Sequence, residues 1–358
     1  MKKIALFFLT ALLSLNFFVA NATIRTVSNR SDKPAQYTTV QAAITASALG
    51  DTILIAGSAT AYGNDFTVDR KIIFMGEGMN NPDGQSTVIS GYVYLSNVNN
   101  AFGSSGTNFY GISFTSYVNI NGNFGGQSTG QNLITNVLFD RCAFSTYFTF
   151  NSQIYTNWTF RNCLFTSSCY LQFNSSTCNN VLITNSIFSR DGFVLYSNIS
   201  MNGQVYIRNC NFMNHTGDLF NATGLVIENN IFFQAQPTGL STSVFNNNLT
   251  YFNNNNTLPY GTNTGANNVL NSNPKFTNFP TTGGAFAWTQ DFALLTGSPA
   301  IGTGTGATNI GITGGSAPVV HNLPGNSKLP VVTSITVPVS SVPVGGTLQI
   351  NVKAKTRK

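Results

Sequence analysis

Charge is the scarcest feature of this 358-residue sequence, because Asp, Glu, Lys and Arg make up only 8% of it, against about a quarter in an average globular protein. The net charge of +6 overstates its basic character. Two lysines lie in the first three positions and four basic residues in the last six, which leaves 11 basic residues to balance 11 acidic ones. Without a basic stripe, the body is not expected to bind nucleic acid.

Histidine and cysteine are too few and too scattered for a metal-binding framework. The sequence has two histidines and five cysteines, with no CxxC pair, which argues against a zinc site. An odd cysteine count also argues against a complete set of disulfides. We expect Cys142, Cys163 and Cys210 to pack in the core as small apolar groups, while the pairing of Cys169 with Cys178 stays open.

Long apolar stretches are absent except at the start. The first 22 residues read MKKIALFFLTALLSLNFFVANA, with two lysines, an apolar run and a small-residue end. This pattern is typical of a secretory signal peptide, with cleavage expected after Ala22. No later stretch is long and apolar enough to cross a bilayer. We therefore expect a protein that is secreted or held at the cell surface, with no transmembrane segment in its mature chain.

An eight-residue motif, in contrast, is abundant. Four segments share apolar and β-branched letters around a polar pair: WTFRNCLF (158–165), VLITNSIF (181–188), VYIRNCNF (205–212) and LVIENNIF (225–232). The last aromatic of the motif falls in a column with spacings of 20 to 30 residues: Phe114, Phe144, Phe165, Phe188, Phe212 and Phe232. Periods of this length indicate a repeat architecture, and the letters bounded by Gly, Asn and Ser clusters are typical of strands.

A second column keeps nearly the same period elsewhere in the repeats. It comprises FNS (150–152), FNS (173–175), YSN (196–198) and FNA (220–222). Strands that recur in this way pair with their next copy, which predicts a solenoid of parallel strands. Before the repeats, Val40, Ile44 and Ala48 form one apolar face behind a Thr38 or Thr39 cap, which predicts a short helix that closes the N-terminal end of the core.

The polar pair inside the motif predicts how each repeat turns a corner. Its first column is Arg141, Asn162, Asn185, Asn209, Asn229 and Asn247. Asparagine tolerates the left-handed backbone of a sharp corner, and we expect these amides to bond one another along the stack. The residue before this column should face outward. There, Asp140 with Arg161 and Arg208 with Glu228 are expected to form surface ion pairs.

The two ends of the repeat resemble a known family. The segments that carry the resemblance are the opening VQAAITASALGDTILIAG (40–57) and KIIFMGEG (71–78), and the closing NNVLNSNPKF (267–276) and DFALLTGSPAIGTGTGATNIGITGG (291–315). They resemble the pectate-lyase-like superfamily of right-handed parallel β-helix proteins. The resemblance covers about residues 23–315. It implies an all-β chain that forms one right-handed parallel β-helix behind a short N-terminal capping helix.

The domain organisation predicted from these patterns has three parts. Residues 1–22 are the signal peptide and residues 23–320 the β-helix. Residues 321–358 are expected to add a strand pair, from VVTSITVPV and GGTLQINVKAK, and a disordered basic tail.

The resemblance leaves the activity open, because the same fold carries lyases, hydrolases, adhesins and non-catalytic surface proteins. Lyases of this family use Ca²⁺, which is held by several carboxylates. Residues 84–290 contain only four acidic residues, Asp140, Asp191, Asp218 and Glu228, and two of these are assigned to ion pairs. We therefore expect no cofactor and no metal site, and Ca²⁺ only if the protein is a lyase after all.

One group of side chains is a candidate for catalysis. The turns that follow the aromatic column in two adjacent repeats carry Arg190, Asp191, His215 and Asp218, so the stacking would bring these residues together. A histidine with carboxylates and an arginine suits acid–base chemistry. A polar loop cluster in solvent is the competing interpretation.

Aromatic side chains offer a different function. Five of them lie in or beside the expected strands: Tyr147, Trp158, Tyr170, Tyr196 and Tyr206. Those that face outward would form a platform on which sugar rings stack. The sequence thus predicts an exported, monomeric, non-catalytic protein that binds extracellular or cell-surface polysaccharide, or has a structural or adhesive role. The alternative is a polysaccharide lyase or glycoside hydrolase.

Overall fold

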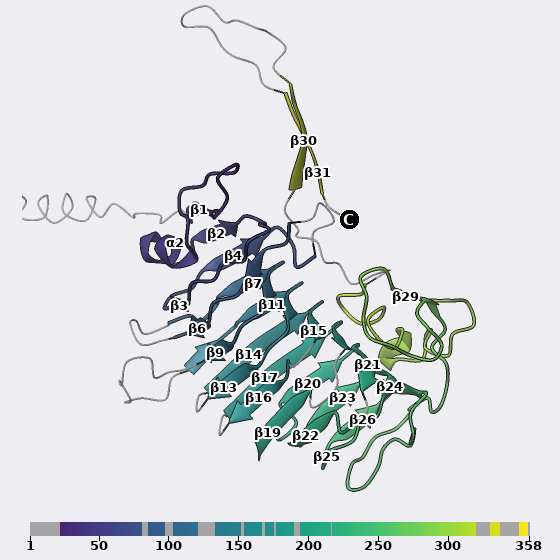
Figure 1. The fold of residues 1–358 in the computed structure, drawn as a ribbon. Helices are drawn as coiled ribbons and strands as arrows, with labels where there is room; N and C mark the ends of the chain where they lie inside the picture. The colour runs from purple at the N-terminus through teal and green to yellow at the C-terminus, as the bar shows by residue number, and fades with distance from the viewer. Residues whose placement is uncertain are drawn as a thin grey trace, which may run out of the picture.

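Three parallel sheets wound around one core make up most of the chain (Figure 1). The computed structural model describes residues 22–80, 85–96, 103–120, 133–151, 154–166, 169–174, 177–189, 194–215, 217–319, 330–336 and 351–356. Within these residues the helices are one α-helix, α2 (Val40–Ala46), and one 3₁₀ turn, η1 (Thr305–Ala307). Residues 1–21 lie outside the described residues, so the signal peptide stays a prediction.

The sheets are named here A, B and C. Sheet A comprises β1 (Ile24–Val27), β2 (Thr52–Ile55), β4 (Ile73–Gly76), β7 (Asn108–Tyr110), β11 (Leu138–Asp140), β14 (Ile154–Arg161), β17 (Thr177–Thr184), β20 (Val205–Arg208), β23 (Val226–Glu228) and β26 (Val244–Asn246), with β10 (Leu133–Thr135) paired to β14. Sheet B comprises β5 (Val88–Ile89), β8 (Ser113–Phe114), β12 (Ala143–Phe144), β15 (Leu164–Thr166), β18 (Ile187–Ser189), β21 (Asn211–His215), β24 (Ile231–Ala235) and β27 (Leu249–Tyr251). Sheet C comprises β3 (Phe66–Val68), β6 (Val93–Leu95), β9 (Val118–Ile120), β13 (Phe148–Asn151), β16 (Leu171–Asn174), β19 (Leu195–Ser200), β22 (Phe220–Thr223) and β25 (Leu240–Ser241).

Each full coil passes through sheets A, B and C in that order, and each strand pairs in parallel with the equivalent strand of the next coil. Trp158 of β14 lies beside Val181 of β17, for example, and Val181 lies beside Val205 of β20. Connections between parallel strands of one sheet are right-handed in nearly all proteins. The predicted right-handed parallel β-helix is confirmed.

The predicted aromatic column is also confirmed, and it fills the core. Successive rings stack with centroid separations of 5.3, 5.2, 4.4, 4.7 and 4.8 Å from Phe114 to Phe232. A parallel column that the sequence reading missed lies on the inner face of sheet A: Phe74, Phe109, Phe139 and Phe160. The two columns meet edge to face, as between Phe139 and Phe144, an arrangement that aromatic rings favour.

The second predicted column is correct for its first two members and wrong for the others. Phe150 pairs with Phe173 in register, but Phe173 then pairs with Ser197 rather than with Tyr196. Phe220 pairs with Leu195. The error arises because the coils differ in length, so a one-residue slip moves a side chain from the inner to the outer face.

The corner between sheets A and B has the predicted left-handed backbone. All six residues of the predicted column have φ between 49° and 58°. Their amides, however, do not bond one another as predicted. Asn185 Nδ2 donates to the carbonyls of Ile312 (3.0 Å) and Gly314 (2.7 Å), and Asn209 Nδ2 donates to Asn309 O (3.2 Å). These side chains therefore hold a distant part of the chain against the corner.

The amide ladder along the axis lies one residue later, inside the corner. Asn230 Nδ2 donates to Asn248 Oδ1 (3.1 Å), and Asn248 Nδ2 donates to Asn268 Oδ1 (3.1 Å). The same column contains Cys142, Cys163 and Cys210, which are fully buried as predicted. Burial raises the pKa of the Cys210 thiol to about 12, so it stays protonated at neutral pH.

All five cysteines are free thiols. Cys169 and Cys178, whose pairing the sequence left open, are both buried and do not form a disulfide. Burial also raises the pKa of Cys178 to about 12. The cysteines therefore act as small core residues.

The two predicted ion pairs are present on sheet A. Arg161 contacts Asp140 at 2.7 Å, and Arg208 contacts Glu228 at 2.9 Å. Both pairs join residues that face each other in adjacent coils. Asp140 is fully buried beneath its partner, whereas the sequence reading placed it at the surface.

Helix α2 is present as predicted, although strand β1 precedes it and the helix is shorter than expected. Thr39 is its N-cap, and Thr39 Oγ1 accepts a hydrogen bond from Ala42 N at 3.3 Å. Val40 and Ile44 are buried in the main core, and the helix packs against β1, β2 and β3 at the N-terminal end of the stack (Figure 1). It ends at Ala46, before the expected Ala48.

The chain after β27 returns along the outside of sheet B. Strands β28 (Phe276–Asn278) and β29 (Asp291–Leu294) form an antiparallel pair. The Phe276 ring of β28 lies 6.1 Å from the Phe233 ring of β24, and Figure 1 labels β29 near β21 and β24. Residues 299–319, named here the closing segment, follow. A second apolar cluster joins this region to the outer face of sheet B; among its members are Leu164, Ile187, Met213, Phe233, Phe276, Phe292, Ile310 and Ile312.

The C-terminal strand pair is present within the described residues, which leave out 337–350. Strands β30 (Pro330–Thr336) and β31 (Asn351–Thr356) are antiparallel. Lys353 and Lys355 lie within β31, in agreement with the predicted strand GGTLQINVKAK. Residues 357–358 lie outside the described residues. No helix among the described residues is long and apolar enough to cross a membrane.

Candidate functional site

Four tyrosines from successive coils line up at the corner where sheet B leads into sheet C. Ring centroids are separated by 5.4 Å between Tyr92 and Tyr117, 5.4 Å between Tyr117 and Tyr147, and 4.5 Å between Tyr147 and Tyr170. Tyr92 and Tyr117 are 40% and 38% exposed, and the other two are partly exposed. We call these four residues the tyrosine ladder.

The local sequence explains why the ladder faces outward. Each tyrosine directly precedes a sheet C strand whose first residue is buried, in YVYL (92–95), YVNI (117–120), YFTF (147–150) and YLQF (170–173). Because successive side chains of an extended chain point to opposite faces, the residue before the buried one points to solvent. The parallel backbone pairing continues through this position, since Val93 N donates to Tyr117 O at 3.0 Å.

Neighbouring rings of the ladder are tilted by 37° to 57°. Rings that were stacked in parallel along the axis would present only their edges to solvent. The tilted rings are exposed or partly exposed, and the face of an aromatic ring can contact a flat apolar partner.

The outer face of sheet C extends this surface with uncharged polar groups. Along the stack, the outward positions at the strand centres are Thr67, Tyr94, Asn119, Thr149, Gln172 and Tyr196, all partly exposed. Hydroxyl and amide groups both donate and accept hydrogen bonds. The combination of aromatic rings and such groups suits a ligand that has apolar faces and many hydroxyls.

The five aromatic residues predicted for a platform have different positions. Tyr147 and Tyr170 belong to the tyrosine ladder, and Tyr196 lies on the outer face of sheet C. Tyr206 is on sheet A, where the Arg208 guanidinium lies 4.6 Å from its ring centroid. Trp158 is fully buried.

Trp158 Nε1 donates to Ile134 O at 2.9 Å inside the core. Sequence reasoning missed Tyr92 and Tyr117, although a tyrosine followed by an apolar–polar–apolar triplet recurs in all four coils. That pattern was the signal that would have identified the ladder.

The predicted catalytic group is only partly visible. Arg190 and Asp191 lie outside the described residues. His215 is at the end of β21 and 4% exposed, and its Nδ1 accepts a hydrogen bond from Gly217 N at 3.2 Å. Asp218 is exposed on the same corner, where its charge adds to the burial that raises the pKa of Tyr260 to about 12.

His215 lines an open cavity of about 460 Å³ near the C-terminal end of the stack. The other lining residues are Gln234, Gln236, Phe252, Asn253, Asn254, Asn256 and Asn271. Its described lining is thus amide-rich, with one phenyl ring and no carboxylate among these residues.

Calcium does not fit the described residues. Ca²⁺ takes six to eight oxygen ligands, several of them carboxylates. Over the described part of the chain, no three His, Cys, Asp or Glu side chains gather in a way that would hold a metal ion. No chemical step is therefore assigned to calcium.

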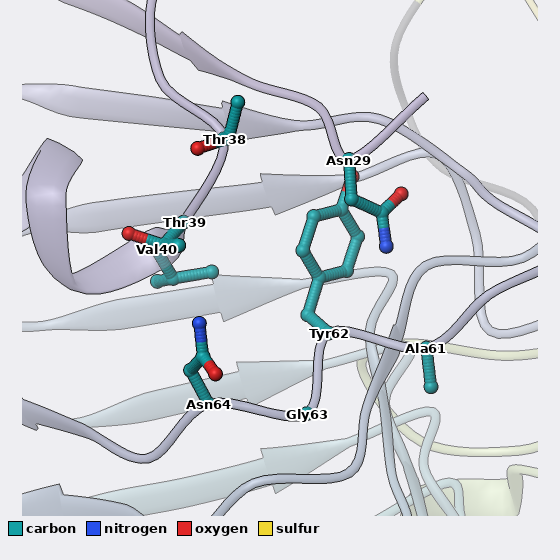
Figure 2. Close-up of a pocket in the computed structure, with 8 residues that line it drawn as sticks. All are labelled: Asn29, Thr38, Thr39, Val40, Ala61, Tyr62, Gly63 and Asn64. Atoms are coloured by element: carbon teal, nitrogen blue, oxygen red, sulfur yellow. The ribbon is translucent and has the colours of Figure 1, made fainter. Parts of the chain in front are cut away.

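A smaller cavity of about 170 Å³ lies between the start of α2 and the loop before β3 (Figure 2). Figure 2 shows the Tyr62 ring rising between Asn29 and the loop of Gly63 and Asn64. Tyr62 is 5% exposed and its hydroxyl donates to Ala56 O at 2.9 Å, while Thr39 caps the helix. These polar groups serve the local structure, so this cavity is a packing gap at the N-terminal end.

The three wound sheets and the short capping helix are the parallel β-helix that the sequence resemblance implied. Solved structures that match include a pectin methylesterase from carrot, with 14% identity and a TM-score of 0.35, over 69% of this chain and 84% of that one. A pectin methylesterase from Aspergillus niger matches with 15% identity and a TM-score of 0.27, over 69% and 87%. Matches this distant say nothing about activity. No protein-family model and no curated protein matches the sequence.

Proposed function

We propose that this protein is exported and binds polysaccharide, without catalysis, through the tyrosine ladder and the outer face of sheet C. The observation that carries the proposal is the ladder itself, in which four partly exposed rings from consecutive coils form one row. Exposed aromatic rows are uncommon on a surface unless they serve binding. The apolar N-terminal segment supports export.

The chemistry of the face supports a sugar ligand. A pyranose ring presents apolar C–H groups on its faces and hydroxyls at its edge. Tyrosine offers a rigid ring with a polar tip, which contributes contact area at low cost in side-chain entropy. Asn119, Thr149 and Gln172 beside the ladder supply donors and acceptors for hydroxyls. A surface site of this kind suits a long polysaccharide, because the site can contact the middle of the polysaccharide and does not need one of its ends.

Replacing rings of the ladder tests this proposal. Removal of two rings by Tyr117→Ala with Tyr147→Ala is expected to weaken binding to polysaccharide by roughly tenfold or more, because each aromatic anchor at an interface contributes about 1 kcal/mol or more. Tyr117→Phe with Tyr147→Phe should keep most of the affinity, because the rings remain. Binding is measured by pull-down on insoluble glycans and by calorimetry with soluble ones.

Tyr206→Ala is the matched control, since Tyr206 is a partly exposed strand tyrosine on sheet A. It should bind as the parent does. The proposal would be wrong if Tyr206→Ala weakened binding as much as the ladder variant, or if the ladder variant bound normally while folded.

The catalytic alternative, a polysaccharide lyase, would require a bound calcium ion. We propose that no calcium ion contributes to the folded state, and melting temperatures with excess Ca²⁺ and with chelator are expected to coincide. A ligand that binds only the folded protein raises its stability by mass action, so a rise of several degrees with Ca²⁺ would contradict this proposal. It would favour the polysaccharide lyase instead.

A further inference from the structure

We infer that the polysaccharide bound on this face is uncharged, an inference that rests on the proposed function. The outward positions at the centres of the sheet C strands are occupied by Thr, Tyr, Asn and Gln from β3 to β19, and Asn221 continues the series in β22. None of these side chains carries a charge. Recognition of a uronic acid requires the opposite, since a carboxylate is bound by Arg or Lys.

Exposed acids lie at both ends of the ladder. Asp65 directly precedes β3 in the position that the tyrosines occupy in later coils, and its Oδ1 accepts a hydrogen bond from Tyr92 N at 2.7 Å. Burial and the Asp65 charge raise the pKa of Tyr94. Asp218 is exposed on the same corner, beyond the ladder. A polyanion laid along the corner would meet like charge at either end.

The described cations of the repeat region lie away from the ladder: Lys71 is just before β4 and Arg141 just after β11, both strands of sheet A, and three arginines are paired with acids. Arg161 and Arg208 are paired with acids on sheet A. Arg70, just after β3, contacts Asp69 at 2.8 Å and donates to Ser47 O. In the loop between β18 and β19, outside the described residues, the sequence places one charge of each sign, Arg190 and Asp191.

Chemistry therefore separates two ligand classes. A neutral glycan needs stacking and hydroxyl contacts, both of which this face supplies. When a polyuronate binds to this face, each carboxylate at the contact loses hydrating water and meets no Arg or Lys in its place. The acids at the two ends of the ladder also repel its carboxylates. Binding of the neutral glycan should also be almost independent of salt, because no charge pair is formed for the ions to screen.

The test compares hexasaccharides of equal length on the full mature chain by calorimetry. The neutral probes are β-1,4-linked glucose, mannose and xylose hexamers, and the acidic probe is hexagalacturonate. We expect at least one neutral hexamer to bind and hexagalacturonate to bind roughly tenfold more weakly or not at all. Gln172→Lys, which puts a cation beside the ladder, should strengthen hexagalacturonate binding at low salt and lose this gain as salt is added.

The outcomes separate the two claims. If hexagalacturonate binds as tightly as the neutral hexamers, and Tyr117→Ala abolishes this binding, the ligand class is wrong while the proposed function stands. If none of the four hexamers binds, the proposed function fails and this inference fails with it. If a neutral hexamer binds and Tyr117→Ala has no effect, binding occurs elsewhere and both claims are wrong.

Discussion

Replacing Phe188 by alanine is expected to lower the free energy of unfolding by about 3–5 kcal/mol. Phe188 is 2% exposed and lies in the middle of the aromatic column, with ring centroids 4.4 Å from Phe165 and 4.7 Å from Phe212. Truncation removes the buried ring and leaves a cavity between two neighbours whose backbones are fixed by strand pairing on both sides. The cavity therefore cannot collapse without breaking backbone hydrogen bonds between adjacent strands.

Phe188→Leu is the matched variant, since it keeps most of the apolar volume and should cost about 1.5 kcal/mol or less. Both are measured by denaturant unfolding and by the melting temperature. Equal losses in the two variants would show that the site tolerates truncation, and would contradict a tightly packed aromatic column.

Asn185 is expected to show two separable effects, one from its side chain and one from its backbone. Its buried amide donates to Ile312 O and Gly314 O, and its φ is 49°. Asn185→Gly removes both of these hydrogen bonds, and the one that Asn185 Oδ1 accepts from Thr184 Oγ1, but tolerates the left-handed backbone, so it should destabilise by about 1–3 kcal/mol. Asn185→Ala should destabilise by about a further 1–2 kcal/mol, because alanine disfavours that backbone.

Asn157 provides the control for the backbone effect alone. It also has a left-handed backbone (φ 57°), but it is exposed, and its amide bonds two surface neighbours: Nδ2 donates to Asn136 Oδ1, and Oδ1 accepts from Asn180 Nδ2. Asn157→Gly should therefore be nearly neutral, while Asn157→Ala should show only the backbone cost. The same unfolding measurements apply. An Asn185→Gly variant as stable as the parent would mean that these hydrogen bonds do not hold the closing segment.

The sequence predicted those features that repeat from coil to coil. The aromatic column ending at Phe232 and the left-handed corner at Asn185 and Asn209 were identified correctly, because the same physical demand recurs at the same place in every coil. The register at Tyr196 was wrong, because coils of unequal length shift the strand by one residue without changing the composition of the stretch.

The candidate site was harder to predict for a related reason. An outward position tolerates many residue types. The column that contains Tyr92 and Tyr117 therefore has other residues in other coils, Asp65 before the tyrosines and the buried Val194 after them. The docking of the closing segment was not predictable from periodicity at all. The asparagine column does repeat in the sequence, but its partners, such as Asn309 O for Asn209 and Thr303 O for Asn247, belong to a segment that has no repeat of its own.

The closing segment also sets an order for the folding of the chain. Contacts between equivalent positions of adjacent coils join residues 18 to 35 positions apart, such as Asn230 with Asn248 and Phe74 with Phe109, so the loops that close them are short. Asn185, in contrast, meets its partners after 127 and 129 residues. Loop closure grows more costly with length, and distant contacts form late. The coils can thus assemble one by one as the chain emerges N-terminus first. The apolar outer face of sheet B stays exposed to solvent until β28, β29 and the closing segment have been made.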